Sequence, residues 1–283
     1  MSRLSRRQFF QLAGSALATV GFSQLNLQRQ ADSYGKVLAQ ITPRKLALLV
    51  GINSYPSHPL RGCVNHVELQ RLLLIHRFGF NPKYLLILTE RQATREGILQ
   101  VFEEHLIKQA KPGDVVVYHY SGHGSRIFDP DLIVVRYTTD NSGLNGTFVP
   151  VDGNLPTGYP AQGGVVKDIM GHTLFLLMSA VKSENLTVVL DSCFSGGATR
   201  DRRVRSRDGG KNIRTSPEEK AYQEMWLSRL NLSREDFIKG YRTGVAKGVV
   251  LAANAPNKFA IYERLNGFEA GAFTYRLNQY MWQ

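Results

Sequence analysis

The chain has 283 residues, of which 43% are hydrophobic and 20% charged. A chain of this length and composition can bury a full hydrophobic core, which excludes a disordered or fibrous protein. The formal net charge of +12 is concentrated, because residues 1–39 carry five cations against one anion and residues 199–214 carry seven against two. The remaining chain carries only +3, so a nucleic-acid partner is not expected. With only two cysteines, Cys63 and Cys193, a disulfide framework and a cysteine-rich metal site are excluded.

Residues 1–39 have the pattern of an export signal. The pair Arg6 and Arg7 precedes an apolar stretch, residues 12–22, that is rich in alanine and glycine. This order resembles a twin-arginine signal peptide, and the stretch is too short to form a stable membrane span. Small residues around Ala39 suit a signal peptidase. We therefore expect export to the periplasm, a thylakoid lumen or the cell exterior; the alternative is a basic amphipathic helix on a cytoplasmic protein.

From residue 44 onward, short apolar runs alternate with segments of helical periodicity. Apolar runs that end in glycine or polar residues predict buried strands, and apolar residues spaced by a helical period predict helices. Residues 130–162 are expected to form a hairpin and loops, and the glycine-punctuated residues 194–220 an exposed flexible loop. The expected strands cover 45–52, 84–90, 114–122, 185–193, 248–255 and 258–263, and the expected helices 63–77, 94–110, 165–181, 218–239 and 271–282.

The alternation of strands and helices indicates the α/β class, with a mostly parallel six-stranded sheet and helices on both faces. In such a sheet, ligands collect beyond the carboxyl ends of the strands. Two polar motifs occupy such ends, "SGHG" at residues 121–124 and "DSC" at residues 191–193. The chemistry of the protein is therefore expected at this edge of the sheet.

The two motifs supply one histidine and one cysteine, His123 and Cys193. A thiol becomes a nucleophile when a base takes its proton or a cation stabilises the thiolate. Equivalent positions at two strand ends allow these side chains to face each other. Neighbouring glycines permit close approach of a substrate and free N–H groups for a developing oxyanion. The alternative is structural, since a lone buried cysteine often acts as a small apolar residue and a lone histidine is often simply hydrogen-bonded.

Three motifs in order along the chain resemble those of the metacaspases, in particular the bacterial members called orthocaspases, within the caspase-like cysteine peptidases. They are "ALLVGINSYPSHPLRGCVN", "YSGHGS" and "VVLDSCFSGG". The resemblance implies one caspase-like domain, a three-layer sandwich, with a p20-like catalytic region at 44–197, an Arg-rich flexible linker at 198–216 and a p10-like region at 217–283. The Gln-Ala that precedes the cysteine in caspases is absent here. The "DSC" form implies a cysteine endopeptidase that cleaves after Arg or Lys.

The resemblance also implies roles for individual residues. Cys193 would be the nucleophile and His123 the general acid and base. The backbone N–H groups of Gly124 and Cys193 would form the oxyanion hole. A Cys-His dyad of this kind needs no cofactor.

The same resemblance implies a pocket for the basic P1 side chain, lined by Asp191, Ser121, Cys63 and the third residue after that cysteine. A carboxylate at the floor of such a pocket pairs well with a guanidinium. The third residue is His66, where the family commonly has Asp. Because one of two acids is lost, we expect a basic P1 preference that is weaker and falls further at acidic pH.

The linker is a candidate substrate of its own enzyme. It places several arginines in a segment expected to be exposed, just after the nucleophile, and proteolytic nicking concentrates in such loops. A tethered site is also present at high effective concentration. A solvated run of charge is the alternative. The candidate cleavage sites are Arg200, Arg202, Arg203, Arg205 and Arg207.

No metal is expected in this protein. His119 and His123 have the spacing of a zinc pair, but a strand separates them and no glutamate follows His119, so His119 is interpreted as structural. Hard cations need several convergent oxygens, so calcium dependence is not expected from scattered acids. The acids in question are Asp129, Asp131, Asp140, Asp152 and Asp168.

The expected partners are protein or peptide substrates with Arg or Lys at P1, bound by a monomer. A different class of function keeps the fold without catalysis, as a peptide-binding or scaffold domain with an altered P1 pocket. The presence of His123, Asp191 and Cys193 together favours the enzyme, because a scaffold needs no base facing a thiol.

Overall fold

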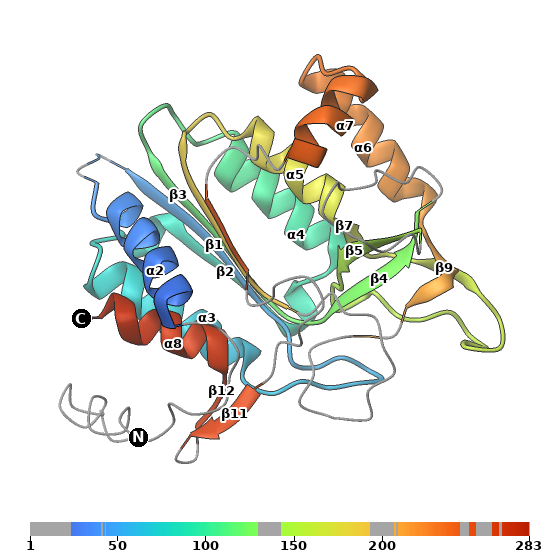
Figure 1. Cartoon of the computed structure of the whole chain (residues 1–283), viewed down its shortest axis with the longest axis horizontal. Coiled ribbons are helices and arrows are strands. Elements are labelled where there is room, and N and C mark those ends of the chain that lie inside the picture. Colours follow the sequence, from blue (N-terminus) through green and yellow to red (C-terminus); the bar gives the residue numbers. More distant parts are fainter. Residues whose placement is uncertain are drawn as a thin grey trace.

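A central parallel sheet organises the protein (Figure 1). The computed structural model describes residues 24–40, 42, 44–129, 143–192, 207, 209–243, 249–252, 262–265 and 268–282. Within these residues the sheet has five strands in the order β10-β8-β3-β1-β2, all parallel. The strands are β1 (Lys45–Gly51), β2 (Leu85–Thr89), β3 (Val115–Ser121), β8 (Asn185–Asp191) and β10 (Val249–Ala252).

The strands of this sheet are apolar because helices cover both of its faces. Along β1, Leu46, Leu48 and Val50 pack into one core, while Ala47 and Leu49 pack into the other. This alternation follows from the two-residue period of a strand, and double coverage makes the whole run hydrophobic. The predicted α/β class and three-layer arrangement are confirmed.

Helices form the two outer layers (Figure 1). One face is covered by α2, α3 and α8, and the other by α4 to α7. The first group is α2 (Gln24–Leu38), α3 (Cys63–His76) and α8 (Ala272–Met281). The second is α4 (Arg95–Val101), which continues as a π-helix over Phe102–Ile107, with α5 (Gly171–Ala180), α6 (Pro217–Arg229) and α7 (Arg234–Thr243).

A predicted helix over 218–239 is two helices in the structure. The first, α6, begins after Ser216, whose hydroxyl accepts from the N–H of Glu219. The chain then turns at Asn231, which has φ 50° and stands between α6 and α7. Asparagine tolerates this left-handed conformation better than most residues, and a right-handed helix cannot continue through it.

A second, smaller sheet lies beyond the carboxyl end of β3, with strand order β6-β9-β4-β5-β7. Its first strand in the chain, β4, begins at Gly124, so the chain enters this sheet directly after His123. The expected hairpin is therefore β4 and β5, with residues 130–142 outside the described part of the chain. The strands are β4 (Gly124–Phe128), β5 (Leu144–Phe148), β6 (Gly164–Val166), β7 (Ile169–Met170) and β9 (Gly210–Thr215).

The second sheet corrects two predictions. The helix expected over 165–181 begins only at Gly171, because residues 164–166 and 169–170 pair as strands. The flexible loop expected over 194–220 is a strand near its described end, since residues 210–215 form β9 between β6 and β4, with Lys211, Asn212 and Arg214 exposed. Ile213 is buried there. The strands β6 and β7 have only three and two residues, and β9 is mostly polar, so none of them shows the alternation of apolar residues that predicts a strand.

The sixth strand of the central sheet is not confirmed. Of the segment 258–263, residues 258–261 lie outside the described part of the chain. Tyr262 and Glu263 belong to β11 (Tyr262–Leu265), which pairs antiparallel with β12 (Phe268–Gly271) in a separate two-stranded ribbon.

Helix α2 lies within the segment predicted to be a removable signal. It packs against α8 and β8, with Tyr34 and Leu38 completely buried in the same core as α3. The hydroxyl of Tyr34 donates to Oε1 of Gln70 at 3.3 Å. Cleavage after Ala39 would therefore remove a packed helix. Residues 1–23 lie outside the described part of the chain, and none of the described helices is long and apolar enough to cross a membrane.

Candidate active site

The predicted site residues gather at the carboxyl edge of the central sheet. The register pairs Gly51 with Ser121 and Ser121 with Asp191, so the last residues of β1, β3 and β8 lie side by side. His123 follows β3 by two residues and is buried. Cys193 follows Asp191 by two residues in the sequence and lies outside the described residues.

The imidazole of His123 is oriented by a backbone carbonyl. Its Nε2 lies 2.6 Å from the carbonyl oxygen of His58, in the loop that follows β1. A carbonyl oxygen only accepts, so Nε2 carries the proton of the neutral ring and Nδ1 carries the lone pair. The ring also packs on Tyr55, with centroids 4.5 Å apart. The contact with His58 therefore selects the tautomer in which Nδ1 is the basic atom.

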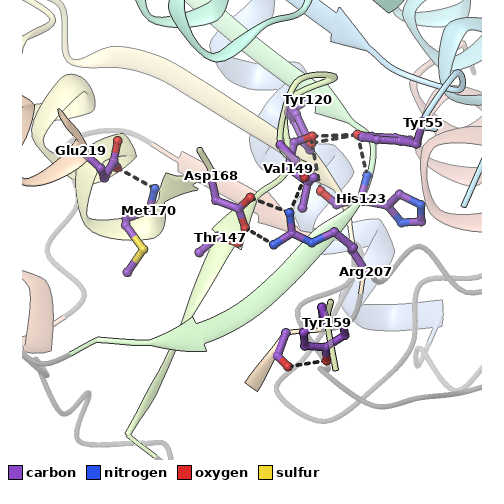
Figure 2. A network of polar contacts seen from close by, with 12 residues as sticks. Tyr55, Tyr120, His123, Thr147, Val149, Tyr159, Asp168, Met170, Arg207 and Glu219 are labelled. Carbon is purple, nitrogen blue, oxygen red and sulfur yellow. Dashed lines mark hydrogen bonds and ion pairs between the residues drawn. The ribbon is translucent and has the colours of Figure 1, made fainter. Parts of the chain in front are cut away.

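Two buried tyrosines hold the backbone of His123 from both ends (Figure 2). The Tyr55 hydroxyl accepts from the N–H of His123 at 3.0 Å and donates to the carbonyl oxygen of Val149 at 2.8 Å. The Tyr120 hydroxyl donates to the carbonyl oxygen of His123 at 2.9 Å, and the same oxygen accepts from the N–H of Val149 at 3.0 Å. Burial raises the pKa of both tyrosines well above the ordinary value, so both stay protonated.

Gly122 makes this arrangement possible. A Cβ at this position would lie 2.6 Å from the Tyr55 hydroxyl and 2.8 Å from that of Tyr120. Both distances are below van der Waals contact. The glycine before the histidine is therefore needed so that the two hydroxyls can reach the next residue.

The residues predicted to bind a P1 side chain form a second buried cluster. Nδ1 of His66 lies 3.0 Å from Oδ2 of Asp191 and 2.9 Å from Oγ of Ser121. The hydroxyl of Thr274, on α8, donates to the same carboxylate oxygen at 2.5 Å. Cys63 is buried one helical turn before His66. The structure thus brings His66, Asp191 and Ser121 into contact, and it occupies Oδ2 of Asp191 with groups of the protein itself.

Arg207 is not the exposed cleavage candidate that was expected. It is 3% exposed, and its guanidinium binds Asp168 through both carboxylate oxygens, at 2.8 and 2.6 Å. Burial raises the pKa of Asp168, and the charge of Arg207 opposes that rise. The other candidates, Arg200, Arg202, Arg203 and Arg205, lie outside the described residues.

Of the five aspartates considered as calcium ligands, those that the structure describes are hydrogen-bonded to other groups of the protein. Asp129 accepts from the side chain of Asn145, and Asp152 accepts from the N–H of Arg95. Asp168 binds Arg207; Asp131 and Asp140 are outside the described residues. In the part of the chain that the structure describes, no group of three or more His, Cys, Asp or Glu residues is placed to hold a metal.

Several residues of the site were missed by sequence reasoning. Tyr120 and Tyr55 lie inside the quoted motifs, and the position of Tyr120, three residues before His123, was a usable signal. The carbonyl of His58 had no signal, because any residue offers one. Thr274 had none either, since it comes from a helix 83 residues after Asp191.

The α/β fold, with a buried histidine at the carboxyl end of β3 and a cysteine two residues past β8, defines a caspase-like protein. The family model described as metacaspase, peptidase C14 domain, matches residues 45–200. The chain therefore belongs to the metacaspase family.

Relatives and solved structures agree with this assignment. The chain is 35% identical over 168 residues to Metacaspase-1 of Meyerozyma guilliermondii. The matched region covers 57% of this chain and 37% of that protein. The chain is 34% identical over 188 residues to Metacaspase-1B of Aspergillus clavatus, covering 60% and 42%. The match thus spans about two fifths of each relative. The crystal structure of protein GSU0716 from Geobacter sulfurreducens has the same fold, with a TM-score of 0.52, 21% identity, and coverage of 82% of this chain and 79% of that one.

Proposed function

We propose that the protein is a cysteine endopeptidase in which Cys193 is the nucleophile and His123 the general acid and base. The observation that carries this proposal is the imidazole of His123, held at the edge of the sheet with Nε2 on the carbonyl of His58. That contact leaves Nδ1 as the atom that takes a thiol proton. The strand that precedes Cys193, β8, is the neighbour of the strand that precedes His123.

The reaction proceeds through a thioester. Nδ1 of His123 takes the proton of the Cys193 thiol, and the thiolate attacks the scissile carbonyl. The backbone N–H groups of Gly124 and Cys193 donate to the oxyanion. The imidazolium then gives its proton to the leaving amine as the C–N bond breaks. Water, deprotonated by the same imidazole, hydrolyses the thioester and restores the thiol.

Asp191 gives the enzyme a preference for Arg or Lys at P1. Its carboxylate lies at the sheet edge beside Ser121, and a guanidinium binds a carboxylate by charge-assisted hydrogen bonds. The substrate must compete with His66, which already contacts Oδ2 of Asp191. The preference is therefore weaker than two acids would give, and it falls at acidic pH, where a protonated His66 repels a basic side chain.

A chloromethylketone with Arg at P1 tests the proposal directly. The folded wild-type protein is expected to be alkylated at Cys193, as located by mass spectrometry, whereas Cys193→Ala and His123→Ala are not. A chloromethylketone with Asp at P1 is the matched control and should label far less. Failure of the folded wild-type protein to react with either compound contradicts the enzyme.

The contact between Asp191 and His66 favours one alternative, a caspase-like peptide-binding or scaffold domain. A carboxylate that is 1% exposed and bound to His66 and Thr274 offers little attraction to a basic side chain. A scaffold would bind an Arg-containing peptide in calorimetry without cleaving it and without labelling of Cys193. Cleavage of that peptide by wild type, and not by Cys193→Ala, rejects this alternative.

Self-cleavage in the linker is part of the proposal, at Arg200, Arg202, Arg203 or Arg205. Its support is the run of basic residues just after the nucleophile. Purified wild type should convert to two fragments, with no conversion of Cys193→Ala. A wild-type chain that stays intact while it cleaves peptides contradicts autoprocessing alone.

Export through a twin-arginine pathway is proposed from residues 1–39, with one change required by α2. Because Tyr34 and Leu38 are buried, cleavage before α2 preserves the core, whereas cleavage after Ala39 does not. Terminal sequencing of exported protein should give a start before residue 24. Lysines in place of Arg6 and Arg7 should block export; unchanged export contradicts the signal.

The enzyme is also proposed to be a monomer that needs no calcium. The engagement of Asp129, Asp152 and Asp168 by neighbouring groups supports the second part. Light scattering gives the mass in solution. Peptide cleavage that is equal in excess EDTA and in millimolar calcium agrees with the proposal, and a calcium requirement contradicts it.

A further inference from the structure

The side chain of Arg207 is buried against three parts of the chain: strand β5, the loop after β5 that contains Gly153, and the connection between β6 and β7 that contains Asp168. Nη1 donates to Oδ1 of Asp168 at 2.8 Å and to the carbonyl oxygen of Gly153 at 2.5 Å, while Nη2 donates to Oδ2 of Asp168 at 2.6 Å. The hydroxyl of Thr147, on β5, donates to Oδ2 of Asp168 at 2.5 Å. Figure 2 shows the guanidinium directed at this carboxylate. The fork of two parallel bonds fixes the direction of the side chain as well as its distance.

The backbone of Arg207 reaches the catalytic loop. Its N–H donates to the carbonyl oxygen of Gly124 at 2.9 Å. The next described residue, Gly209, lies so close to β4 that a Cβ would be 2.1 Å from the carbonyl oxygen of Arg126. Tyr159 holds Gly209 in place through a bond of 2.9 Å to its carbonyl oxygen. Arg207 and Gly209 therefore both lie directly on β4, the strand that follows His123.

Gly124 needs to be held from both sides. Glycine has more conformational freedom than any other residue, so its two peptide planes turn easily unless each is bonded. The plane before it is held because the carbonyl of His123 accepts from Val149 and Tyr120. The plane after it is restrained on one side by the pairing of β4 with β5 and on the other by the N–H of Arg207, which donates to the carbonyl oxygen of Gly124.

We propose that Arg207 is a positioning residue: its ion pair with Asp168 holds its backbone N–H on the carbonyl of Gly124 and so fixes the glycine next to His123. This proposal rests on the proposed function, because it matters for activity only if the N–H of Gly124 binds an oxyanion. An arginine with this role is also unsuited to be a cleavage site, since binding in a P1 pocket requires the loss of both bonds to Asp168. We therefore expect self-cleavage before Arg207, which leaves the contacts of Arg207 intact.

Replacement of the whole pair tests the positioning role. Removal of one partner leaves a buried charge, whereas Asp168→Leu with Arg207→Met replaces the ion pair by apolar groups and is expected to fold. We call the ion pair of Arg207 with Asp168, together with the bond from the N–H of Arg207 to Gly124, the clamp. Without the clamp, kcat on an Arg-P1 peptide should fall about tenfold, because a misplaced Gly124 stabilises the transition state less, while KM changes less than about twofold. In an otherwise wild-type protein, Arg207→Lys keeps the charge but loses the two parallel bonds to Asp168. Its kcat should therefore lie between that of the wild type and that of the double variant.

The ion pair of Arg44 and Asp114 supplies the matched control. It is partly buried, with a distance of 2.8 Å, and lies at the opposite, amino end of β1 and β3. Arg44→Met with Asp114→Leu should keep the wild-type kcat. Wild-type kcat in a folded Asp168→Leu/Arg207→Met protein overturns the positioning role, as does an equal loss in the control pair.

Trypsin reports on the clamp independently of the protein's own activity. In the Cys193→Ala background, the bond after Arg207 should resist trypsin, and Asp168→Asn should accelerate its cleavage at least tenfold, because local opening then requires no broken ion pair. Equal rates with and without Asp168→Asn overturn the clamp. Absence of chloromethylketone labelling in wild type, with this protection intact, instead contradicts the proposed peptidase.

Discussion

The hydroxyl of Tyr55 offers the sharpest test of how His123 is held. Tyr55→Phe keeps the ring that packs on the imidazole and removes the atom that accepts from the N–H of His123 and donates to Val149. A buried donor left without an acceptor costs about 1–3 kcal/mol. If the activation free energy rises by that amount, kcat falls by about 5- to 150-fold, since 1.36 kcal/mol corresponds to a factor of ten in rate.

The assay is steady-state cleavage of an Arg-P1 peptide, with thermal unfolding measured in parallel. We expect kcat to fall and KM to change less, because the hydroxyl that is removed bonds to the N–H of His123. Tyr118→Phe is the control: it removes another buried tyrosine hydroxyl from β3 and retains the ring that packs on Phe102. An unchanged kcat in Tyr55→Phe, or an equal loss in Tyr118→Phe, would refute the reasoning.

Three further predictions concern specificity, the N-terminal helix and pH. His66→Asp should raise kcat/KM for Arg-P1 peptides by about tenfold or more, because a second carboxylate replaces a competitor for Asp191; no gain contradicts this account. Tyr34→Ala should lower the free energy of unfolding by about 3–5 kcal/mol in urea titrations, while the exposed Arg29→Ala changes it by less than about 0.5 kcal/mol. Burial lowers the pKa of His105, so the unfolded chain takes up a proton first and stability should fall as pH drops below about 6.5. His105→Gln should make that fall shallower, and an identical pH profile would contradict it.

The P1 pocket shows how one substitution acts through its neighbours. His66 does more than lack a carboxylate, because its Nδ1 contacts both Asp191 and Ser121. Two of the other three predicted wall residues are thus engaged with it. The strength and pH dependence of the basic preference therefore depend on the contact between His66 and Asp191.

The linker shows a similar reversal of role. The seven cations in residues 199–214 were expected in an exposed flexible loop, either as cleavage sites or as a solvated run of charge. One of them, Arg207, is instead buried against Asp168, and residues 210–215 form β9. Charge alone did not distinguish this arginine from the others, because its partner lies 39 residues away.

The sequence by itself determined the class of fold, five strands of the central sheet and the residues at their ends. It did so because buried strands need apolar runs and because parallel strands bring their carboxyl ends to one edge. The resemblance of its motifs to those of metacaspases further implied that Asp191, Ser121 and His66 line one pocket, and the structure brings them into contact. Only the tertiary structure decided that α2 is a packed part of the core, that His58 and Tyr55 hold His123, and that Arg207 lies on Gly124. These contacts join residues far apart in the chain through backbone carbonyls, hydroxyls and one ion pair, and such pairings leave no periodic pattern in a sequence.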